Sequence, residues 1–346
     1  MRVILGLSGG VDSAVAAALL VERGCTVVGA YLKFDDGSAT CPAKEDIAIA
    51  RRVAAVLDIP FIVRDVSALY EREVLAPMRR GYTQGVTPNP DAACNRRVKF
   101  AELSALAAEH GADAVATGHY ARIRRSARGR IELLRGADGE KDQSYFLWEC
   151  TTRQLATVVF PIGCYAKPQV RAMARFRGLP NWDRPSTRGV CFLGTQDFSG
   201  YLATHEQPIP AAVVTTDGRH LGTVPMGQAY TIGQRVRIGG QPAPRYVVAR
   251  DAVRQEITVT ASPEDPARFT RVLTATHANW IGGMPPADGA LFARIRHRQE
   301  PQPCTIRTTA HRVVVDFDRP QLAVAPGQAI VFNDGARIIG GAVIMA

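Results

Sequence analysis

The sequence of 346 residues predicts an α/β protein with a doubly wound, mainly parallel sheet, followed by two smaller β modules, the last a β-barrel. Apolar strands alternate with amphipathic helices in the first part, whereas short alternating strands and turn residues dominate beyond about residue 200. The length exceeds what one ordinary core holds, so we expect three domains. Their expected bounds are 1–200, 205–268 and 270–346.

The elements of the first domain follow from hydrophobic periodicity. In chain order, strands are expected at 3–7, 26–32, 61–66 and 114–117, and helices at 13–22, 45–57 and 100–108. The long stretch between the third strand and the last helix is predicted to be irregular. Sheets of this kind bind ligands at the carboxyl ends of their strands.

The later elements are predicted from turn residues and alternation. Asp217 and Gly218 separate apolar runs at 211–216 and 220–224, which predicts a hairpin. The run 291–298 alternates and puts arginines on one face. Further strands are expected at 313–317, 329–332 and 338–344, with an Asn333-Asp334-Gly335 turn between the last two.

Composition limits the class of protein. Lys and Arg exceed Asp and Glu by 42 − 32 = 10 and the pI is about 9.5, which fits a polyanionic partner or simply a basic proteome. The seven cysteines include no C-x-x-C pair, which disfavours a disulfide framework or a structural zinc site. We expect a cytoplasmic enzyme, because no apolar run approaches a membrane span and the first apolar run is too short for a signal peptide.

The first strand leads into a glycine-rich turn at the start of a helix. The turn consists of Gly6, Leu7, Ser8, Gly9, Gly10, Val11, Asp12 and Ser13. Adjacent glycines let backbone N–H groups approach an anion, and the helix directs its positive end to the same place. The Walker A lysine is absent, and the turn resembles the S-G-G-x-D-S loop of the ATP pyrophosphatase (PP-loop) family. That resemblance implies cleavage of ATP between the α and β phosphates; a plain glycine turn is the alternative.

Two cysteines lie in segments suited to reactive thiols. Cys94 and Asp91 follow Pro88 and Pro90, which predict a rigid loop, and the cations of Arg96, Arg97 and Lys99 come next. Cys191 lies between Gly189 and Gly194, close in sequence to Arg184 and Arg188. Each thiol alone is as compatible with a structural role as with a reactive one.

Together these segments resemble tRNA-specific 2-thiouridylases over essentially the whole chain. Three further segments carry the resemblance: Thr117-Gly118-His119-Tyr120-Ala121-Arg122, Lys141-Asp142-Gln143-Ser144-Tyr145-Phe146-Leu147 and Thr231-Ile232-Gly233-Gln234-Arg235. The implied reaction is ATP-dependent 2-thiolation of the wobble uridine in tRNAs for Lys, Glu and Gln. The implied partners are tRNA and a sulfur-relay protein or cysteine desulfurase, with no role for DNA or a membrane.

The resemblance also assigns roles to residues. Gly6–Ser13 would hold ATP, with Leu32 and Gly118 on the adenosine side, and Mg²⁺ would come with ATP, without a protein metal site or prosthetic group. Cys191 would carry a persulfide and Cys94 would be the partner thiol. Positions matched to the target base or the tRNA are Asn89, Pro90, Asp91, His119, Lys141, Asp142, Gln143, Arg296, His297 and Gln328.

The mechanism that we expect begins with transfer of AMP to the C2 oxygen of uridine, which turns it into a leaving group. Sulfur then reaches C2 from the persulfide directly, or as hydrosulfide freed when Cys94 attacks; both routes leave a Cys94–Cys191 disulfide. Asp91 is our candidate proton shuttle, because a carboxylate on a rigid loop beside the base is well placed. A simple turn-forming aspartate is the alternative.

Arginine clusters predict the RNA surface. One candidate rail is Arg294, Arg296 and Arg298, and the other is Arg122, Arg124, Arg125, Arg128 and Arg130, although a solvated charged face is equally compatible. Among the remaining cysteines, Cys25, Cys150 and Cys164 are expected to fill the core, and Cys41 is ambiguous.

Competing functions are a small-molecule synthetase with the same loop, a lysidine synthetase, a 4-thiouridine synthase, or a nucleic-acid-binding protein that has lost catalysis. The two thiols, the basic excess and the β modules disfavour the first. The thiols and the loop at Asn89–Asp91 disfavour the second, and the terminal modules disfavour the third. The intact loop at Ser8–Ser13 and both thiols disfavour the last.

Overall fold

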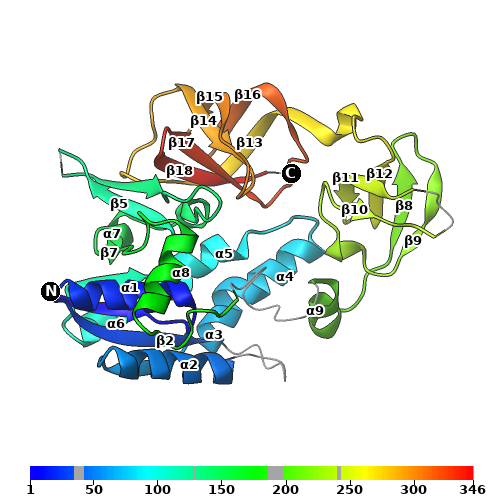
Figure 1. Ribbon diagram of the computed structural model, residues 1–346. Coiled ribbons are helices and arrows are strands. Elements are labelled where there is room, and N and C mark those ends of the chain that lie inside the picture. The colour runs from blue at the N-terminus through cyan, green and yellow to red at the C-terminus, as the bar shows by residue number, and fades with distance from the viewer. Residues whose placement is uncertain (35–42, 128, 186–197, 240–242, 346) are drawn as a thin grey trace.

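The protein is described by a computed structural model that covers residues 1–34, 43–127, 129–185, 198–239 and 243–345. Figure 1 shows an α/β part, a small β unit to one side of it, and a β-barrel packed above. The doubly wound α/β class with two following β modules is therefore confirmed. Cys191, with Arg188, Gly189 and Gly194, and Cys41 lie outside the described residues.

The first sheet is parallel throughout and has the order β3-β2-β1-β4-β7. Its strands are β1 (Arg2–Gly6), β2 (Thr26–Lys33), β3 (Phe61–Asp65), β4 (Ala114–Thr117) and β7 (Val158–Val159). Val3, Ile4 and Leu5 are fully buried, as expected for a strand covered by helices on both faces. The chain adds strands on one side of β1 and then on the other, so the carboxyl ends of β1 and β4 form the topological switch point.

Helices cover both faces of this sheet (Figure 1). The longer ones are α1 (Val11–Glu22), α2 (Ala43–Val56), α6 (Phe100–Glu109) and α8 (Lys167–Phe176). Shorter helices elsewhere in the chain are η3 (Ser144–Leu147), α7 (Thr152–Leu155), α9 (Phe198–His205), η4 (Gly227–Ala229) and η5 (Pro266–Arg268). No helix among the described residues has the length and apolar character that a bilayer crossing requires.

The stretch predicted to be irregular is mostly helical. Its elements are α3 (Ser67–Tyr70), the π-helix η1 (Glu71–Leu75), α4 (Ala76–Thr83), α5 (Pro90–Ala93) and the π-helix η2 (Cys94–Lys99). Pro90 does not prevent a helix, because it occupies the first turn, where its missing N–H has no intrahelical partner to lose. The Asn89 side chain caps this helix by accepting from the Ala92 N–H at 3.4 Å. Asp91 and Cys94 are therefore carried by a helix, and only Thr87–Asn89 remains a loop.

The middle module is one five-stranded sheet with the order β10-β11-β12-β8-β9. The strands are β8 (Ala211–Thr215), β9 (His220–Val224), β10 (Arg235–Val236), β11 (Arg245–Asp251) and β12 (Glu256–Thr260). The hairpin around Asp217 and Gly218 is confirmed, with Gly218 at a φ of 84°. We expected an antiparallel module, but β12 pairs with β8 in parallel, so the sheet is mixed.

The last module is a closed antiparallel barrel. Its strands are β13 (Phe269–Trp280), β14 (Gly289–Arg294), β15 (Gln302–Thr308), β16 (Val313–Leu322), β17 (Ala329–Asp334) and β18 (Arg337–Ile344). β13 pairs with both β16 and β18, which closes the ring. The run expected at 291–298 ends as a strand at Arg294.

A hairpin from the first part of the chain extends this barrel sheet. β5 (Ala121–Arg125) pairs with β6 (Ile131–Arg135), and β6 continues onto β18 through the register pair Leu133 and Ile338. These strands were not predicted, although Ala121, Arg122, Ile123 and Arg124 alternate between apolar and charged residues. The hairpin joins the barrel to the α/β part.

Candidate nucleotide and base site

The phosphate loop lies at the carboxyl end of β1, directly before α1. Gly9 has a φ of 79°, and a Cβ there would come within 2.7 Å of the Asp46 carbonyl oxygen, so the position requires glycine. The Oγ atoms of Ser8 and Ser13 are 3.2 Å apart, and Ser13 Oγ donates to the Gly10 carbonyl at 3.0 Å. Hydroxyls and helix N–H groups thus converge on one point, as an anion site requires.

Asp12, in the first turn of α1, is held by two groups from distant parts of the chain. Lys167 Nζ lies 2.6 Å and 2.7 Å from the two carboxylate oxygens, and the Tyr120 hydroxyl donates to Oδ1 at 2.8 Å. Desolvation and the carboxylate raise the Tyr120 pKa above its ordinary range, so the hydroxyl remains a donor. Lys167 was not predicted as a site residue.

The two residues expected on the adenosine side lie at the ends of β2 and β4, the strands that flank β1. Leu32 is buried near the end of β2. Gly118 follows β4, and a Cβ there would lie 2.6 Å from the Ser13 nitrogen, so any side chain would push the strand end away from α1. This close approach explains the glycine.

His119 lies next to Gly118 and is half-buried between Phe100 and Phe160, each at 5.9 Å between ring centroids. Desolvation, together with the nearby Lys99 charge, lowers its pKa to about 3, so the imidazole is neutral at pH 7. Its Nδ1 is 2.7 Å from Thr117 Oγ1. A charge-assisted phosphate contact is therefore not available to His119 at neutral pH.

A cavity of about 530 Å³ lies where the three parts of the chain meet. It brings together six residues predicted to face the base or the tRNA: Asn89, Pro90, Asp91, Arg296, His297 and Gln328. Sequence reasoning gave no role to its other walls, among them Tyr82, Tyr145, Phe146, Phe198, Thr231 and Gln234. Aromatic walls with a few polar groups suit an unstacked base.

The loop that forms one side of this cavity is held by the barrel. Gln328 Nε2 donates to the carbonyl oxygens of Thr87 and Pro88 at 3.0 Å and 3.2 Å, and the Thr87 N–H donates to the Pro326 carbonyl at 2.7 Å. The middle module adds a hydroxyl contact between Thr87 and Thr231 at 3.2 Å. The base-facing loop therefore has its shape only when all three parts are assembled.

Burial sets the protonation of the titratable groups in the cavity. Desolvation raises the pKa of Asp91, opposed by Lys99 and His297. Desolvation lowers the pKa of His297, whose ring packs on Phe146 at 4.4 Å. His297 Nε2 lies 2.6 Å from the Asp142 carbonyl oxygen, which can only accept, so this nitrogen carries the proton.

Within the segment 141–143, the structure contradicts the expected tRNA contact for Asp142. Asp142 is only 1 % exposed and forms ion pairs with Arg294 at 3.1 Å and Arg135 at 3.3 Å. Although burial opposes it, Arg294 lowers the Asp142 pKa, so the carboxylate stays charged and structural. Gln143 Oε1 accepts from the Tyr120 N–H at 3.0 Å, and Lys141 is partly exposed.

The arginines of the first predicted rail do not lie together on one exposed face. Arg294 is 1 % exposed and faces the Asp142 carboxylate, because the strand ends there and its side chain points inward. Arg296 and Arg298 are both exposed, and Arg296 also donates to the carbonyls of Ile232 and Ala323 at 3.3 Å and 3.0 Å.

The second rail is broken by local contacts. Arg122 Nε donates to the Arg135 carbonyl at 2.8 Å, and Arg124 pairs with Glu132 at 2.6 Å. Arg125 and Arg130 are exposed, and Arg128 lies outside the described part of the chain.

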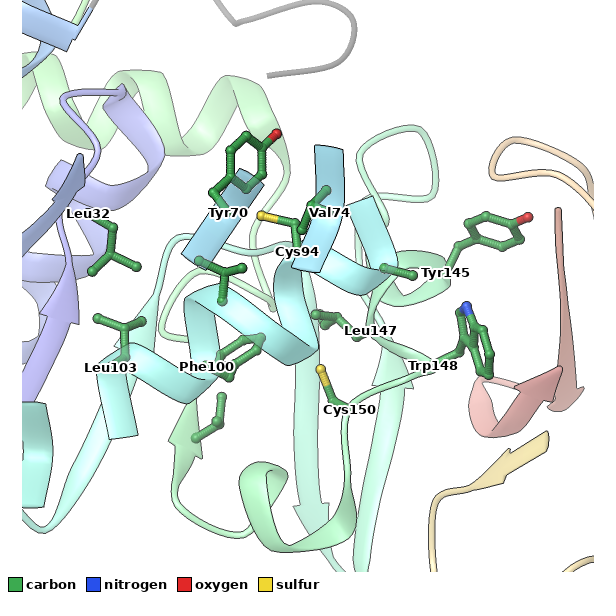
Figure 2. Packing of buried hydrophobic residues seen from close by; sticks show 14 of the residues in the cluster. Leu32, Tyr70, Val74, Cys94, Phe100, Leu103, Tyr145, Leu147, Trp148 and Cys150 are labelled. Atoms are coloured by element: carbon green, nitrogen blue, oxygen red, sulfur yellow. The ribbon is translucent and has the colours of Figure 1, made fainter. Parts of the chain in front are cut away.

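Cys94 is the first residue of η2 and is 6 % exposed. Figure 2 shows it between Tyr70 and Val74, which belong to the neighbouring helix. Arg97 and Arg96 share one carboxylate, that of Glu149, at 2.9 Å and 3.5 Å. The thiol itself is covered by packed side chains and is not held on an exposed loop.

The segment that precedes Cys191 in the sequence contacts the phosphate loop. Asn181 Nδ2 and Arg184 Nη1 donate to the Gly9 carbonyl at 2.8 Å and 3.3 Å. Residue 184 is therefore fixed at the nucleotide loop, seven positions before the second thiol.

The other cysteines follow the prediction with one exception. Cys150 is buried, and desolvation raises its pKa; Cys25 is half-buried. Cys164 is exposed, which contradicts its expected place in the core, because it lies in a surface turn before α8. Among the described residues, no cluster of three His, Cys, Asp or Glu side chains could hold a metal ion.

Comparison with known proteins gives matches along the chain. The tRNA methyl transferase HUP domain family matches residues 1–195, the tRNA methyl transferase PRC-barrel domain family 199–261, and the aminomethyltransferase beta-barrel domain family 270–344. The chain is 42% identical over 355 residues to the tRNA-specific 2-thiouridylase MnmA of Halorhodospira halophila, covering 99% of this chain and 93% of the relative. The proteins of that name from Pseudomonas syringae and Xanthomonas euvesicatoria are 40% and 41% identical, covering 99% and 100% of this chain and 94% of each relative.

Proposed function

Because the chain belongs to the tRNA-specific 2-thiouridylase family, we propose that it replaces the C2 oxygen of a tRNA uridine by sulfur with consumption of ATP. The observation that carries this proposal is the cavity at the junction of the three parts, which gathers Asn89, Asp91 and His297 beside aromatic walls. The wobble uridine of tRNAs for Lys, Glu and Gln is the substrate, and the reaction takes place in the cytoplasm.

The nucleotide binds at the switch point of the parallel sheet. Its phosphates lie against Gly6–Ser13, and its adenosine lies toward Leu32 and Gly118. The convergence of Ser8, Ser13 and the first turn of α1 supports this placement. The functional division of the chain is 1–200 for nucleotide binding and thiolation, with 205–268 and 270–346 completing the base cavity.

Mg²⁺ enters with the nucleotide in this proposal. Both carboxylate oxygens of Asp12 are engaged by Lys167, and Oδ1 also by Tyr120. The residues present therefore do not fit a resident ion held by the protein alone. This suits an ion bound mainly through phosphate oxygens and water.

Activation of the base uses the polar groups of the cavity. The C2 oxygen of uridine attacks the α phosphorus, pyrophosphate leaves, and the oxygen becomes part of a good leaving group. Asn89 and Asp91 face the base, and Asp91 moves the proton that the pyrimidine ring gives up. Its raised pKa supports this role, because the carboxyl group is then protonated nearer to neutral pH.

Sulfur transfer uses the two thiols. A donor protein, either a sulfur-relay protein or a cysteine desulfurase, supplies the persulfide on Cys191. In the direct route the terminal sulfur attacks C2 and AMP leaves; Cys94 then attacks Cys191 Sγ, which breaks the S–S bond of the adduct and releases the thiolated base. In the other route Cys94 attacks Cys191 Sγ first and releases hydrosulfide, which attacks C2 as AMP leaves. Both routes end in a Cys94–Cys191 disulfide, which an external thiol reductant reduces.

One assay tests the proposal. The full chain is incubated with ATP, Mg²⁺, a sulfide source with a thiol reductant, and unmodified tRNA for Lys, and the digested nucleosides are analysed by mass spectrometry. We expect 2-thiouridine only with ATP present, and AMP and pyrophosphate in equal amounts. A methylated nucleoside, or AMP formation that ignores RNA, would overturn it.

Variants of the thiols supply the controls. Cys191→Ser and Cys94→Ser abolish thiolation with a protein persulfide donor, whereas Cys164→Ser is matched in residue type and leaves it unchanged. Full activity of Cys191→Ser with that donor contradicts the persulfide role.

A further inference from the structure

We propose that Lys167 is a positioning residue of the nucleotide site, which neutralises the Asp12 carboxylate so that the loop accepts the triphosphate of ATP. The inference rests on the proposed use of this loop for ATP. Lys167 would act through Asp12 and would not touch the phosphates itself.

The pair is built into the meeting of two helices. Asp12 is the second residue of α1, and Lys167 is the first residue of α8, which packs against α1. Lys167 is 8 % exposed, and its backbone N–H donates to Asp138 Oδ2 at 2.9 Å, which fixes the start of α8. Nζ reaches both oxygens of Asp12 within 2.7 Å, and the Tyr120 hydroxyl holds Oδ1 from another side.

The charges at the loop explain why such a pair is needed. The start of a helix carries the equivalent of about half a positive elementary charge, and the carboxylate of Asp12 carries a full negative charge in the same turn. An uncompensated Asp12 would therefore reverse the sign of the field that an incoming polyphosphate meets. No lysine occupies the Walker A position of the loop, so compensation must come from elsewhere in the fold.

Among the residues that the structure describes, a second cation near the loop is already committed. Arg184 donates to the Gly9 carbonyl at 3.3 Å, but its guanidinium also forms an ion pair with Asp46. Lys167 is therefore the group whose charge directly balances Asp12. Removal of Lys167 alone would leave a carboxylate without its counter-ion at the helix start.

The fixed position of Tyr120 gives the arrangement a second support. Gln143 holds its backbone from both sides, accepting from the Tyr120 N–H at 3.0 Å and donating its own N–H to the Tyr120 carbonyl at 2.9 Å. The hydroxyl therefore cannot follow Asp12 if the carboxylate swings toward the nucleotide. Lys167 and Tyr120 together keep Asp12 turned away from the anion.

The test is a double-mutant cycle on nucleotide binding. Affinity for α,β-methylene-ATP is measured by calorimetry, without RNA, for the full chain and for Lys167→Met, Asp12→Asn and the double variant. We expect Lys167→Met to weaken binding by about tenfold or more. A tenfold loss of affinity corresponds to about 1.4 kcal/mol, which is less than the usual cost of leaving one charge of a buried ion pair without its partner. The double variant should bind within about threefold of Asp12→Asn, because no carboxylate remains to neutralise.

Controls separate the possible outcomes. Lys33→Met removes another Lys–Asp pair near the carboxyl end of the sheet, with side chains 33% and 57% exposed, and should leave affinity unchanged. An equal loss on Lys167→Met in the unaltered chain and in the Asp12→Asn variant would show a direct phosphate contact and overturn the inference. If Lys167→Met does not fold, comparison of Asp12→Asn with the double variant still decides, since neither contains the unpaired carboxylate. If the unaltered chain does not bind the analogue, the proposed use of ATP fails instead.

Discussion

The surroundings of the Asp91 carboxyl group lower the free energy of unfolding at neutral pH, and the same surroundings suit this group to proton transfer. Burial raises its pKa, so folding shifts this carboxyl group toward the protonated form relative to the unfolded chain. In the unfolded chain the group ionises in the ordinary aspartate range. The protonated Asp91 therefore contributes its full share of the free energy of unfolding only below the pKa of the unfolded chain. This contribution is lost as the pH rises from that pKa through the higher pKa of the folded protein.

Asp91→Asn tests both consequences. The amide cannot ionise, so this variant should melt at a higher temperature than the unaltered protein at pH 7, with a smaller difference at pH 4. Thiolation should fall by about 10²–10⁴-fold, the usual contribution of acid–base catalysis. Melting curves at the two pH values and a single-turnover assay measure the two effects; a lower melting temperature at pH 7 would contradict the assigned burial cost.

Residue-level prediction succeeds where a motif is local and fails where the fold brings groups together. The turn Gly6–Ser13 was recognised because its glycines, hydroxyls and helix start are contiguous. Lys167 was missed because it contacts Asp12 across 155 positions, and a lysine before a proline has no distinguishing pattern. Asp142 was misplaced because a matched motif does not reveal that Arg294 buries it.

At the scale of elements, the two π-helical segments explain the surroundings of Cys94. η1 lies within the helix from Ser67 to Thr83, η2 lies within the helix from Pro90 to Glu109, and the two segments are in contact. A π-helical turn is rare and is often found at functional sites. Tyr70 and Val74 cover the thiol from one helix, so the sulfur needs a shift of these elements to reach the base.

This arrangement predicts protected chemistry for Cys94. Alkylation by iodoacetamide, followed peptide by peptide, should be slow at Cys94 and at buried Cys150 and fast at exposed Cys164. With tRNA and α,β-methylene-ATP present, Cys94 should react at least about tenfold faster, because thiol reactivity depends on access. Cys150 should not change. Rapid alkylation of Cys94 in the protein alone would show that no such shift is needed.

Proline explains why these helices were not predicted. Two prolines close together predict a loop, because proline disrupts the interior of a helix or strand. Pro90 instead begins a helix that Asn89 caps, a position that tolerates proline. The regular strands β1, β2 and β4 were predicted within a residue or two, because buried apolar runs leave little ambiguity.

At the scale of the whole molecule, the excess of ten positive charges favours a long-range attraction to RNA. Several of the arginines expected to provide it are used internally, as with Arg294, or paired, as with Arg124. Exposed Arg130 and Arg298 remain candidates for phosphate contacts.

The salt dependence of tRNA binding tests this distribution. The logarithm of the affinity should fall linearly with the logarithm of salt concentration, and Arg130→Gln with Arg298→Gln should reduce the slope by about two, roughly one per lost phosphate contact. Arg254→Gln is the control, since this side chain is 78% exposed at the turn between β11 and β12. An unchanged slope in the double variant would place the phosphates elsewhere.

The hairpin β5–β6 has a consequence for how the protein can be dissected. Its residues precede most of the barrel by more than a hundred positions, yet β6 takes its outer hydrogen bonds from β18 near the end of the chain. A fragment that ends at residue 268 would have a bare strand edge on β6, the kind of surface through which copies associate. Independent expression of the α/β part therefore requires redesign of that edge, and during synthesis the hairpin has no neighbour until residues 337–344 have been made.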